Sequence, residues 1–303
     1  MRISLVVPTL NAGKFIEPLI IRLKEQTIPV DEIVVVDSAS DDDTVSIASK
    51  FDGVKVISIE RKDFNHGGTR DLAIQQTTGD FILCITQDAL PCDEFYVERL
   101  IAPFAENDRI AMTSGRQVPR PNANPIEKLN REFNYPTTCF TRSKEDIPRL
   151  GIKTFFASDC CSAYRRSAYE AIGGFDKRIL INEDMKIAAQ FIYAGYKIAY
   201  VGLAGVWHSH DYSLKQQYAR NFDVSVFMTQ HPELFANISA TSEGIKMVKW
   251  VEKKLILHGH FISAAYYLVE SFVKFMANRK GKTYKTMTKQ QLVNCSMHKN
   301  YWV

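Results

Sequence analysis

The chain has 303 residues, of which 46% are apolar and 24% are charged, so it can bury one large α/β core and is not expected to be disordered. Its formal net charge of +4 is too small to indicate nucleic-acid binding. The charge is distributed unevenly, because the chain from residue 240 onward carries 11 Lys and Arg residues against 3 Asp and Glu residues. The 6 cysteines show no spacing typical of zinc or redox sites, which predicts reduced thiols in a cytoplasmic protein.

The first residues, MRISLVVPTLN, contain one arginine and a short apolar run that Pro8 ends. This pattern predicts a first strand and not a signal peptide. The most apolar stretch, 255–277, is interrupted by two histidines, Glu270 and Lys274, which argues against a membrane span. We therefore expect a soluble protein, or one attached peripherally to the inner face of the plasma membrane.

Short apolar strands alternate with helical patterns in the first part of the chain. Strands are predicted at 3–7, 33–36, 54–59 and 81–85, with helices between them. This alternation indicates an α/β fold with a mostly parallel sheet that helices cover on both faces. Ligands of such sheets bind at the carboxyl ends of the strands.

The rest of the chain has a weaker pattern and then a helical one. Residues 113–160 predict long loops with a helix near 125–134, and residues 198–201 predict another strand. From about residue 214 the pattern is almost wholly helical. We therefore expect a sheet domain at 1–213 and a helical C-terminal region at 214–303.

Polar residues stand where the predicted strands end. The first strand ends at Pro8 and Thr9, the second ends at Asp37, and the fourth runs into a turn with Gln87 and Asp88. Asp37 either contacts a ligand or stabilises a turn, and Asp88 either contacts a ligand or caps the next helix. We favour the ligand roles, because other acids nearby are better placed as helix caps.

Residues 66–71, HGGTRD, place two glycines and a cation at the start of a predicted helix. Glycines let backbone amides approach an anion, and a helix N-terminus favours negative charge, so a diphosphate is the natural ligand. The alternative is a flexible turn in which Arg70 forms a surface ion pair.

An ordered set of motifs between residues 6 and 220 resembles the family 2 inverting glycosyltransferases with the GT-A fold. Among them it is most similar to the bacterial rhamnosyltransferases that build surface polysaccharides. The motifs are VVPTLN at 6–11, VVVDSASDDDT at 34–44, FNHGGTRDLA at 64–73, TQDA at 86–89, SAYRR at 162–166, GGFD at 173–176, NED at 182–184 and Q-x-x-R at 217–220. The resemblance implies a Rossmann-like nucleotide-sugar-binding half at about 1–112 and an acceptor half at 113–213.

The resemblance also implies which residues bind the nucleotide-sugar donor and its metal. The donor-binding positions match Pro8, Thr9, Asp37, Arg70, Gln87, Asp88 and Asp159. Most members hold Mg²⁺ or Mn²⁺ with a D-x-D pattern, of which this chain keeps only the last acid, Asp88. A histidine is implied as a second metal ligand, and of His208 and His210 we prefer His208.

Glu183 and Asp184 open a predicted helix, where both could simply complement the helix dipole. The resemblance implies instead that Asp184 is the base that deprotonates the acceptor hydroxyl and that Glu183 supports it. Gln217 and Arg220 lie one helical turn apart and match a motif that contacts the acceptor or the diphosphate. Asn221 stands where processive members have tryptophan, which favours the addition of one or a few sugars.

We therefore expect a metal-dependent enzyme that transfers L-rhamnose from dTDP-rhamnose to a hydroxyl of a lipid-linked glycan. The alternatives are the same reaction with a UDP-hexose or UDP-N-acetylhexosamine donor, or a catalytically silent nucleotide-sugar-binding scaffold. A dinucleotide oxidoreductase is disfavoured, because the G-x-G-x-x-G turn is missing after the first strand. The basic and aromatic residues after 240 fit a membrane surface and a contact in a homo-oligomer equally well.

Overall fold

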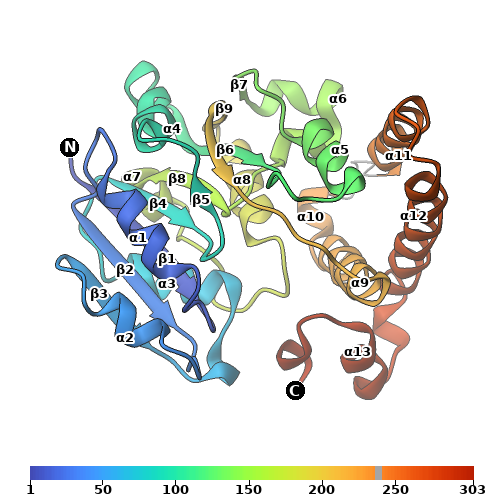
Figure 1. Cartoon of the computed structure of the whole chain (residues 1–303), viewed down its shortest axis with the longest axis horizontal. Helices are drawn as coiled ribbons and strands as arrows, with labels where there is room; N and C mark the ends of the chain where they lie inside the picture. Colours follow the sequence, from blue (N-terminus) through green and yellow to red (C-terminus); the bar gives the residue numbers. More distant parts are fainter. Residues whose placement is uncertain (236–240) are drawn as a thin grey trace. The chain divides into compact units, whose positions relative to one another are not determined.

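The computed structural model describes residues 1–235 and 241–303 (Figure 1). They form two compact units. The first, here called the sheet unit, consists of Met1–Val118, Tyr135–Ile179 and Glu183–His208. The second, here called the helical unit, consists of Pro119–Asn134, Leu180–Asn182 and Ser209–Val303. The predicted helical region at 214–303 includes 236–240, which lie outside the described residues.

A nine-stranded mixed sheet forms the centre of the sheet unit. Its strands follow the order β3-β2-β1-β4-β8-β6-β9-β5, and β7 pairs with β9. The bounds are β1 Ile3–Thr9, β2 Glu32–Asp37, β3 Val54–Ser58, β4 Phe81–Ile85, β5 Leu90–Pro91, β6 Ile110–Val118, β7 Phe140–Arg142, β8 Cys161–Arg165 and β9 Lys197–Trp207. Strands β1 to β4 are parallel, and β8 runs antiparallel between β4 and β6. The predicted α/β fold with a mixed, mostly parallel sheet is confirmed.

Strand β1 is mostly apolar because both of its faces are buried. Successive side chains point to opposite faces, and Leu5, Val6 and Val7 are all fully buried. Leu5 and Val7 share one apolar core with α1 (Ile16–Lys24) and α4 (Tyr96–Glu106). Each such side chain contributes about 1.5–3 kcal/mol on burial.

The four strands predicted in the first 85 residues are confirmed as β1 to β4, and the predicted strand at 198–201 is part of β9. The sequence pattern did not reveal β6, and of β8 it indicated only a strand end at SAYRR, 162–166. Both strands carry polar residues, such as Thr113 and Ser162, which are nevertheless buried. Their apolar runs are therefore too short to stand out.

The register of the strands brings their ends to one edge of the sheet. Thr9 lies opposite Asp37, and Val6 lies opposite Cys84. The antiparallel β8 begins at the same edge, because Cys161 lies opposite Ile85 of β4. The loops after β1, β2 and β4 and the loop before β8 therefore meet where this fold class binds ligands.

The helical unit is built from α9 (Leu214–Gln230), α11 (Thr241–Leu257) and α12 (Phe261–Gly281), with α5 (Pro125–Asn134) from earlier in the chain. Helix α12 packs along α9, and α5 packs against α11 and α12. Helix α5 confirms the helix predicted near 125–134. Because α5 belongs to the helical unit, the compact units do not follow the boundary at 213/214, which stays a prediction about functional domains.

The remaining helices are α2 Thr44–Ala48, α3 His66–Ile74, α6 Ile147–Leu150, α7 Arg166–Ala171, α8 Glu183–Tyr193, α10 Pro232–Phe235 and α13 Lys289–Cys295. Helix α3 packs on β1 and β2. The six cysteines are free thiols. Within 1–235 and 241–303, none of the helices combines the length and the hydropathy that a bilayer span requires.

Candidate active site

Asp37 ends β2 and stabilises the turn that follows it. Its Oδ1 accepts hydrogen bonds from Thr9 Oγ1 at 3.0 Å and from Ser40 Oγ at 2.5 Å. Its Oδ2 accepts a hydrogen bond from the Ser40 amide at 2.8 Å, and the residue is only 1% exposed. These contacts favour the turn-stabilising role, and nucleotide binding by Pro8, Thr9 and Asp37 stays a prediction.

Gln87 joins the loop after β4 to the loop after β1. Its Oε1 accepts a hydrogen bond from the Leu10 amide at 2.8 Å, and its Nε2 donates one to the Leu10 carbonyl at 3.1 Å. One side chain thus satisfies both backbone groups of Leu10, as a neighbouring strand would. Gln87 fixes the spacing of two loops in which donor contacts are predicted.

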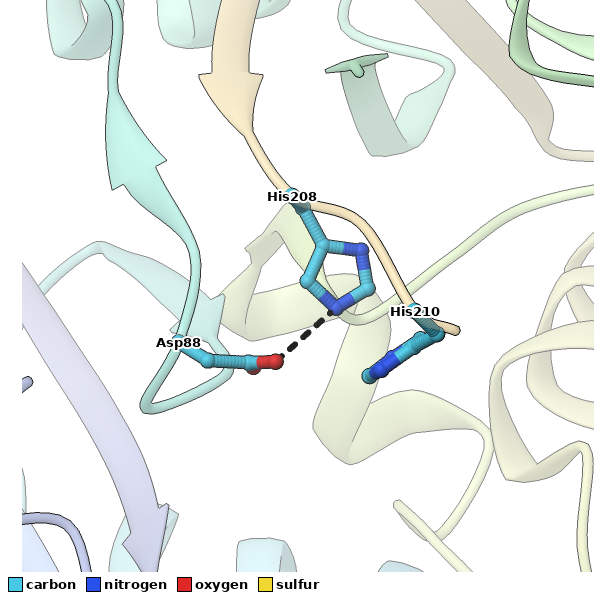
Figure 2. Close-up of side chains that lie close together, drawn as sticks. All are labelled: Asp88, His208 and His210. Carbon is cyan, nitrogen blue, oxygen red and sulfur yellow. Dashed lines mark ion pairs between the residues drawn. The ribbon is translucent and has the colours of Figure 1, made fainter. Parts of the chain in front are cut away.

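Asp88, His208 and His210 form a candidate cation site beside the ends of β4 and β9 (Figure 2). His208 Nε2 lies 3.5 Å from Asp88 Oδ2. One ligand atom from each of the three side chains lies within 4.8 Å of the other two. Carboxylate oxygen suits Mg²⁺ and Mn²⁺, and imidazole nitrogen suits Mn²⁺ better than Mg²⁺. The structure thus brings together the two predicted ligands, Asp88 and His208, and adds His210.

Gln117 orients His208, and the sequence analysis did not identify it. Its Nε2 lies 2.8 Å from both Tyr135 Oη and Ser158 Oγ, to which it donates hydrogen bonds. Its Oε1 therefore faces His208 Nδ1, at 2.8 Å, and accepts the proton of that nitrogen. This network places a proton on His208 Nδ1, so His208 Nε2 can face Asp88 or a cation. A metal-binding histidine usually has this arrangement.

Cys160 lies against His208 at the same edge of the sheet. Thr86 Oγ1 donates a hydrogen bond to Cys160 Sγ at 3.5 Å. Burial lowers the pKa of His208, but Cys160 and Asp88 outweigh burial and raise this pKa to about 9. For the Cys160 thiol, burial acts in the opposite direction and raises the pKa. Hydrogen bonding with Cys161 and the charge of His208 outweigh burial and bring the pKa of Cys160 well below the ordinary thiol value. A cation bound by His208 has to displace the ring proton.

Arg70 lies in the interior of the sheet unit and pairs with two acids. Its Nη1 lies 2.6 Å from Glu183 Oε1, and its Nε lies 3.7 Å from Asp159 Oδ2. Arg70 is 4% exposed and Asp159 is 1% exposed. Asp159 Oδ1 also accepts hydrogen bonds from Ser162 and Tyr164, at 2.6 and 2.5 Å. The surface ion pair weighed as an alternative is wrong, and donor binding by Arg70 and Asp159 stays a prediction.

Asp184 lies beside this buried pairing. Its Oδ2 accepts a hydrogen bond from the Asp159 amide at 3.2 Å, and its Oδ1 accepts one from the Met185 amide at 2.7 Å. Burial, then the charges of Glu183 and Asp159, raise the pKa of Asp184 well above its usual value. A raised pKa makes its carboxylate a stronger base, which suits proton abstraction from a hydroxyl.

Residues of one short loop connect the acid cluster with the candidate cation site. Asp159 contacts Arg70 and Asp184, and the next residue, Cys160, contacts His208. The cluster of Asp159, Glu183 and Asp184 and the cation site therefore border the same segment before β8. A base that deprotonates an acceptor and a cation that binds a diphosphate have to lie near each other in this way.

Gly67 and Gly68 at the start of α3 serve close packing. A Cβ added at Gly67 would lie 2.5 Å from the Asp176 carbonyl oxygen, and one at Gly68 would lie 2.5 Å from that of Lys177. The Gly68 amide already donates to Asn65 Oδ1 at 3.2 Å, so Asn65 caps this helix. The Gly68 amide, one of the backbone groups proposed for a diphosphate, is thus engaged within the protein.

Gln217 and Arg220 lie on α9 in the helical unit. Arg220 is exposed and Gln217 is partly exposed. Asn221 Nδ2 donates a hydrogen bond to the Gln217 carbonyl at 2.8 Å, within the helix. Their contact with the acceptor or the diphosphate stays a prediction.

Comparisons with known proteins identify relatives of the whole chain. The family model described as "Glycosyl transferase family 2" matches residues 4–173. The O-antigen chain rhamnosyltransferase RfbN of Salmonella typhimurium is 39% identical over 305 residues, which cover 100% of this chain and 96% of RfbN. The O-antigen chain rhamnosyltransferase WbaN of Salmonella anatum is 38% identical, over 99% of this chain and 95% of WbaN.

Two solved structures share the fold at low sequence identity. A mannosyltransferase from Pyrobaculum calidifontis, in complex with GDP-Man and Mn²⁺, superposes with a TM-score of 0.65 and 16% identity, over 94% of this chain and 88% of that one. Residues 1–349 of Staphylococcus aureus TarS superpose with a TM-score of 0.55 and 16% identity, over 94% and 91%. The predicted GT-A architecture is confirmed by these neighbours.

We expect Arg70→Met to lower the free energy of unfolding by about 3–5 kcal/mol, because it leaves Glu183 and Asp159 buried without their cation. Arg70→Lys keeps the charge and should lose less. Chemical denaturation measures both, with Arg149→Met as control, since the Arg149 side chain is 71% exposed and pairs with Asp146 at the surface. A loss for Arg70→Met no larger than for Arg149→Met would show that the buried pairing does not stabilise the fold.

We expect Gly68→Ala to destabilise the protein by about 1–3 kcal/mol, because the added methyl group meets the Lys177 backbone. Gly244→Ala in α11 is the matched control. A Cβ there meets nothing within 4 Å, so the better helix propensity of alanine should stabilise that helix slightly. Thermal unfolding of both variants tests this, and equal stability of the two variants would contradict it.

Proposed function

The chain belongs to glycosyl transferase family 2 and is a glycosyltransferase, and on this premise we propose that it transfers L-rhamnose from dTDP-rhamnose. The proposed acceptor is a hydroxyl of a lipid-linked surface-polysaccharide intermediate, and the anomeric configuration inverts. The observation that carries the sugar assignment is the similarity, over nearly the full length, to two O-antigen chain rhamnosyltransferases.

In this proposal the donor lies along the carboxyl ends of β1, β2 and β4. The edge carries Pro8 and Thr9 on β1, Asp37 on β2, and Gln87 after β4. Hydrogen bonds within the protein hold the loops after these strands, which supports a preformed nucleotide site. Arg70 and Asp159 are proposed to bind the donor behind this edge. Gln217 and Arg220 are proposed to contact the acceptor or the diphosphate.

Asp184 is the proposed base. Its carboxylate takes the proton of the acceptor hydroxyl, and the acceptor oxygen forms its bond to the anomeric carbon as the bond to the diphosphate oxygen breaks. Glu183 holds Arg70, which limits the repulsion that Asp184 experiences from the other acids. The backbone amides of Asp159 and Met185 fix the direction of the Asp184 carboxylate.

Asp88 and His208, joined by His210, are the proposed ligands of Mg²⁺ or Mn²⁺. A divalent cation there supplies charge stabilisation for the departing diphosphate. Two imidazoles favour Mn²⁺. The single carboxylate leaves several positions for phosphate oxygens and water, so we propose that the donor contributes to cation affinity.

A UDP-hexose or UDP-N-acetylhexosamine donor remains the alternative within this class. The S. aureus TarS fragment, whose fold is similar, has also been solved in complex with UDP-GlcNAc. A silent scaffold is the alternative outside this class, suggested by the incomplete D-x-D pattern. The buried cluster around Asp184, in which one arginine faces three acids, favours an enzyme, because such clusters are costly to keep without a use.

We expect Asp184→Asn to reduce the transfer rate by about 10²- to 10⁴-fold, because it removes the proton acceptor. Asp108→Asn, at a side chain that is 100% exposed, is the control and should leave the rate unchanged. The wild-type rate should fall as the pH drops through the raised pKa of Asp184, hence at a higher pH than for an ordinary aspartate. Transfer to a lipid-linked acceptor is the measurement.

The same assay decides the donor and the class of function. With dTDP-rhamnose and UDP-sugars compared at equal concentration, faster turnover of dTDP-rhamnose supports the proposal. Equal turnover of UDP-hexoses would remove the rhamnosyl assignment. Donor binding without turnover of any donor would favour the scaffold, and full activity of Asp184→Asn would remove Asp184 as the base.

We expect chelation to abolish transfer and Mn²⁺ to restore it. Gln117→Leu should raise the Mn²⁺ concentration needed by about 10- to 100-fold, because His208 loses the acceptor that orients it. Gln117→Glu keeps an acceptor oxygen and should retain more of the affinity. Calorimetric titration with Mn²⁺ checks affinity independently of activity, and transfer that persists in chelator would contradict a role of the candidate site in catalysis.

A further inference from the structure

Helix α12 exposes large apolar side chains and turns its two central charged residues toward its buried side. Between Phe261 and Asn278 its two charged residues are Glu270 and Lys274, which form an ion pair at 2.5 Å. Glu270 is 4% exposed, and Lys274 lies on the same partly buried side. The exposed side carries Phe261, Ile262, Leu268, Val269, Phe272 and Phe275, which are 51–89% exposed. The buried side also carries Ala264, Tyr267 and Ala277, so α12 is apolar on both sides, whereas an ordinary surface helix is polar on its exposed side.

The exposed apolar residues form one continuous face. They recur at helical spacing over four turns, which corresponds to a length of about 20–25 Å at 1.5 Å per residue. The preceding turn extends the face, because Ile256 and Leu257 at the end of α11 are 52% and 70% exposed. Single exposed apolar residues are common on proteins, but a contiguous face of this size marks an interaction surface.

The charges that flank this apolar face are positive. The exposed side of α11 carries Lys246, Lys249 and Lys253, and α12 ends with Arg279 and Lys280. The acids on α11 and α12 are Glu243, which pairs with Lys246 at 2.5 Å, Glu252, which is partly buried, and Glu270, which pairs with Lys274. A partner of negative charge is therefore favoured over a second copy of the same basic surface.

We propose that the exposed face of α12, together with the turn after α11, lies on an anionic lipid bilayer. The apolar side chains enter the boundary between headgroups and acyl chains, and the lysines of α11 meet the anionic headgroups. Helix α12 lies in the plane of the interface and does not cross it. The inference does not depend on the donor sugar or on the chemistry at Asp184.

Vesicle flotation of the full chain tests this surface. Wild type should float with vesicles of phosphatidylglycerol and phosphatidylethanolamine, and should bind phosphatidylcholine vesicles weakly. Leu268→Glu should lower the partition coefficient at least tenfold. Leu203→Glu in β9 is the matched control, because Leu203 is 60% exposed and Leu268 56%, and it should bind as wild type does. Lys249→Glu should lower partition about fivefold or more, because a charge is reversed.

The controls separate membrane binding from other causes. Circular dichroism and thermal unfolding should be the same for Leu268→Glu and wild type, because the replaced side chain is exposed. If Leu268→Glu fails to fold, Leu268→Ser carries the same comparison. Wild type that does not float, or Leu268→Glu that floats equally well, overturns the proposal. A wild-type dimer that Leu268→Glu dissociates, without vesicle binding, would show that a second copy covers the face.

Discussion

One buried cation, Arg70, holds the catalytic edge of the sheet unit together. Its guanidinium pairs with Glu183 at the start of α8 and with Asp159 in the loop before β8. Charges taken out of water are costly unless they are paired, so α3, α8 and this loop can pack together only while the guanidinium lies between them. The same cation offsets part of the repulsion among Asp159, Glu183 and Asp184. In the proposed mechanism it thereby keeps Asp184 available as a proton acceptor, although the surroundings of Asp184 disfavour charge.

Side chains, more than backbone pairing, set the geometry beyond the ends of the strands. Gln87 takes the place of a strand partner for Leu10, Ser40 and Thr9 hold Asp37, and Gln117 fixes the ring of His208. Each of these contacts is directional, so together they position groups that a reaction needs within a narrow range. Hydrogen bonds within the protein thus preorganise the candidate site before any substrate binds.

The strands and the family motifs were predictable because their information is local. Apolar runs identify β1 to β4, whereas β6 is missed and only the end of β8 is indicated, because buried polar residues interrupt both strands. The contacts of the site are not local: Arg70 and Glu183 are 113 residues apart, and Gln117 and His208 are 91 apart. The motifs correctly drew attention to Arg70, yet no pattern showed that it faces inward. The glycines before it suggested an anion site, but the adjoining backbone at 176–177 explains them by packing.

The role of the C-terminal region, too, could not be predicted from the sequence alone. Its basic and aromatic composition fits a lipid surface and a subunit contact equally well, because composition does not tell which residues share a face. In α12 the ion pair of Glu270 and Lys274 lies on the side toward the rest of the helical unit, together with Tyr267, whereas Phe272 and Phe275 are exposed. Covering the exposed side would gain free energy, since about 25 cal/mol is gained per Å² of apolar surface removed from water. We therefore infer that another apolar phase covers the exposed apolar side of α12. The surrounding lysines make an anionic bilayer the phase that fits.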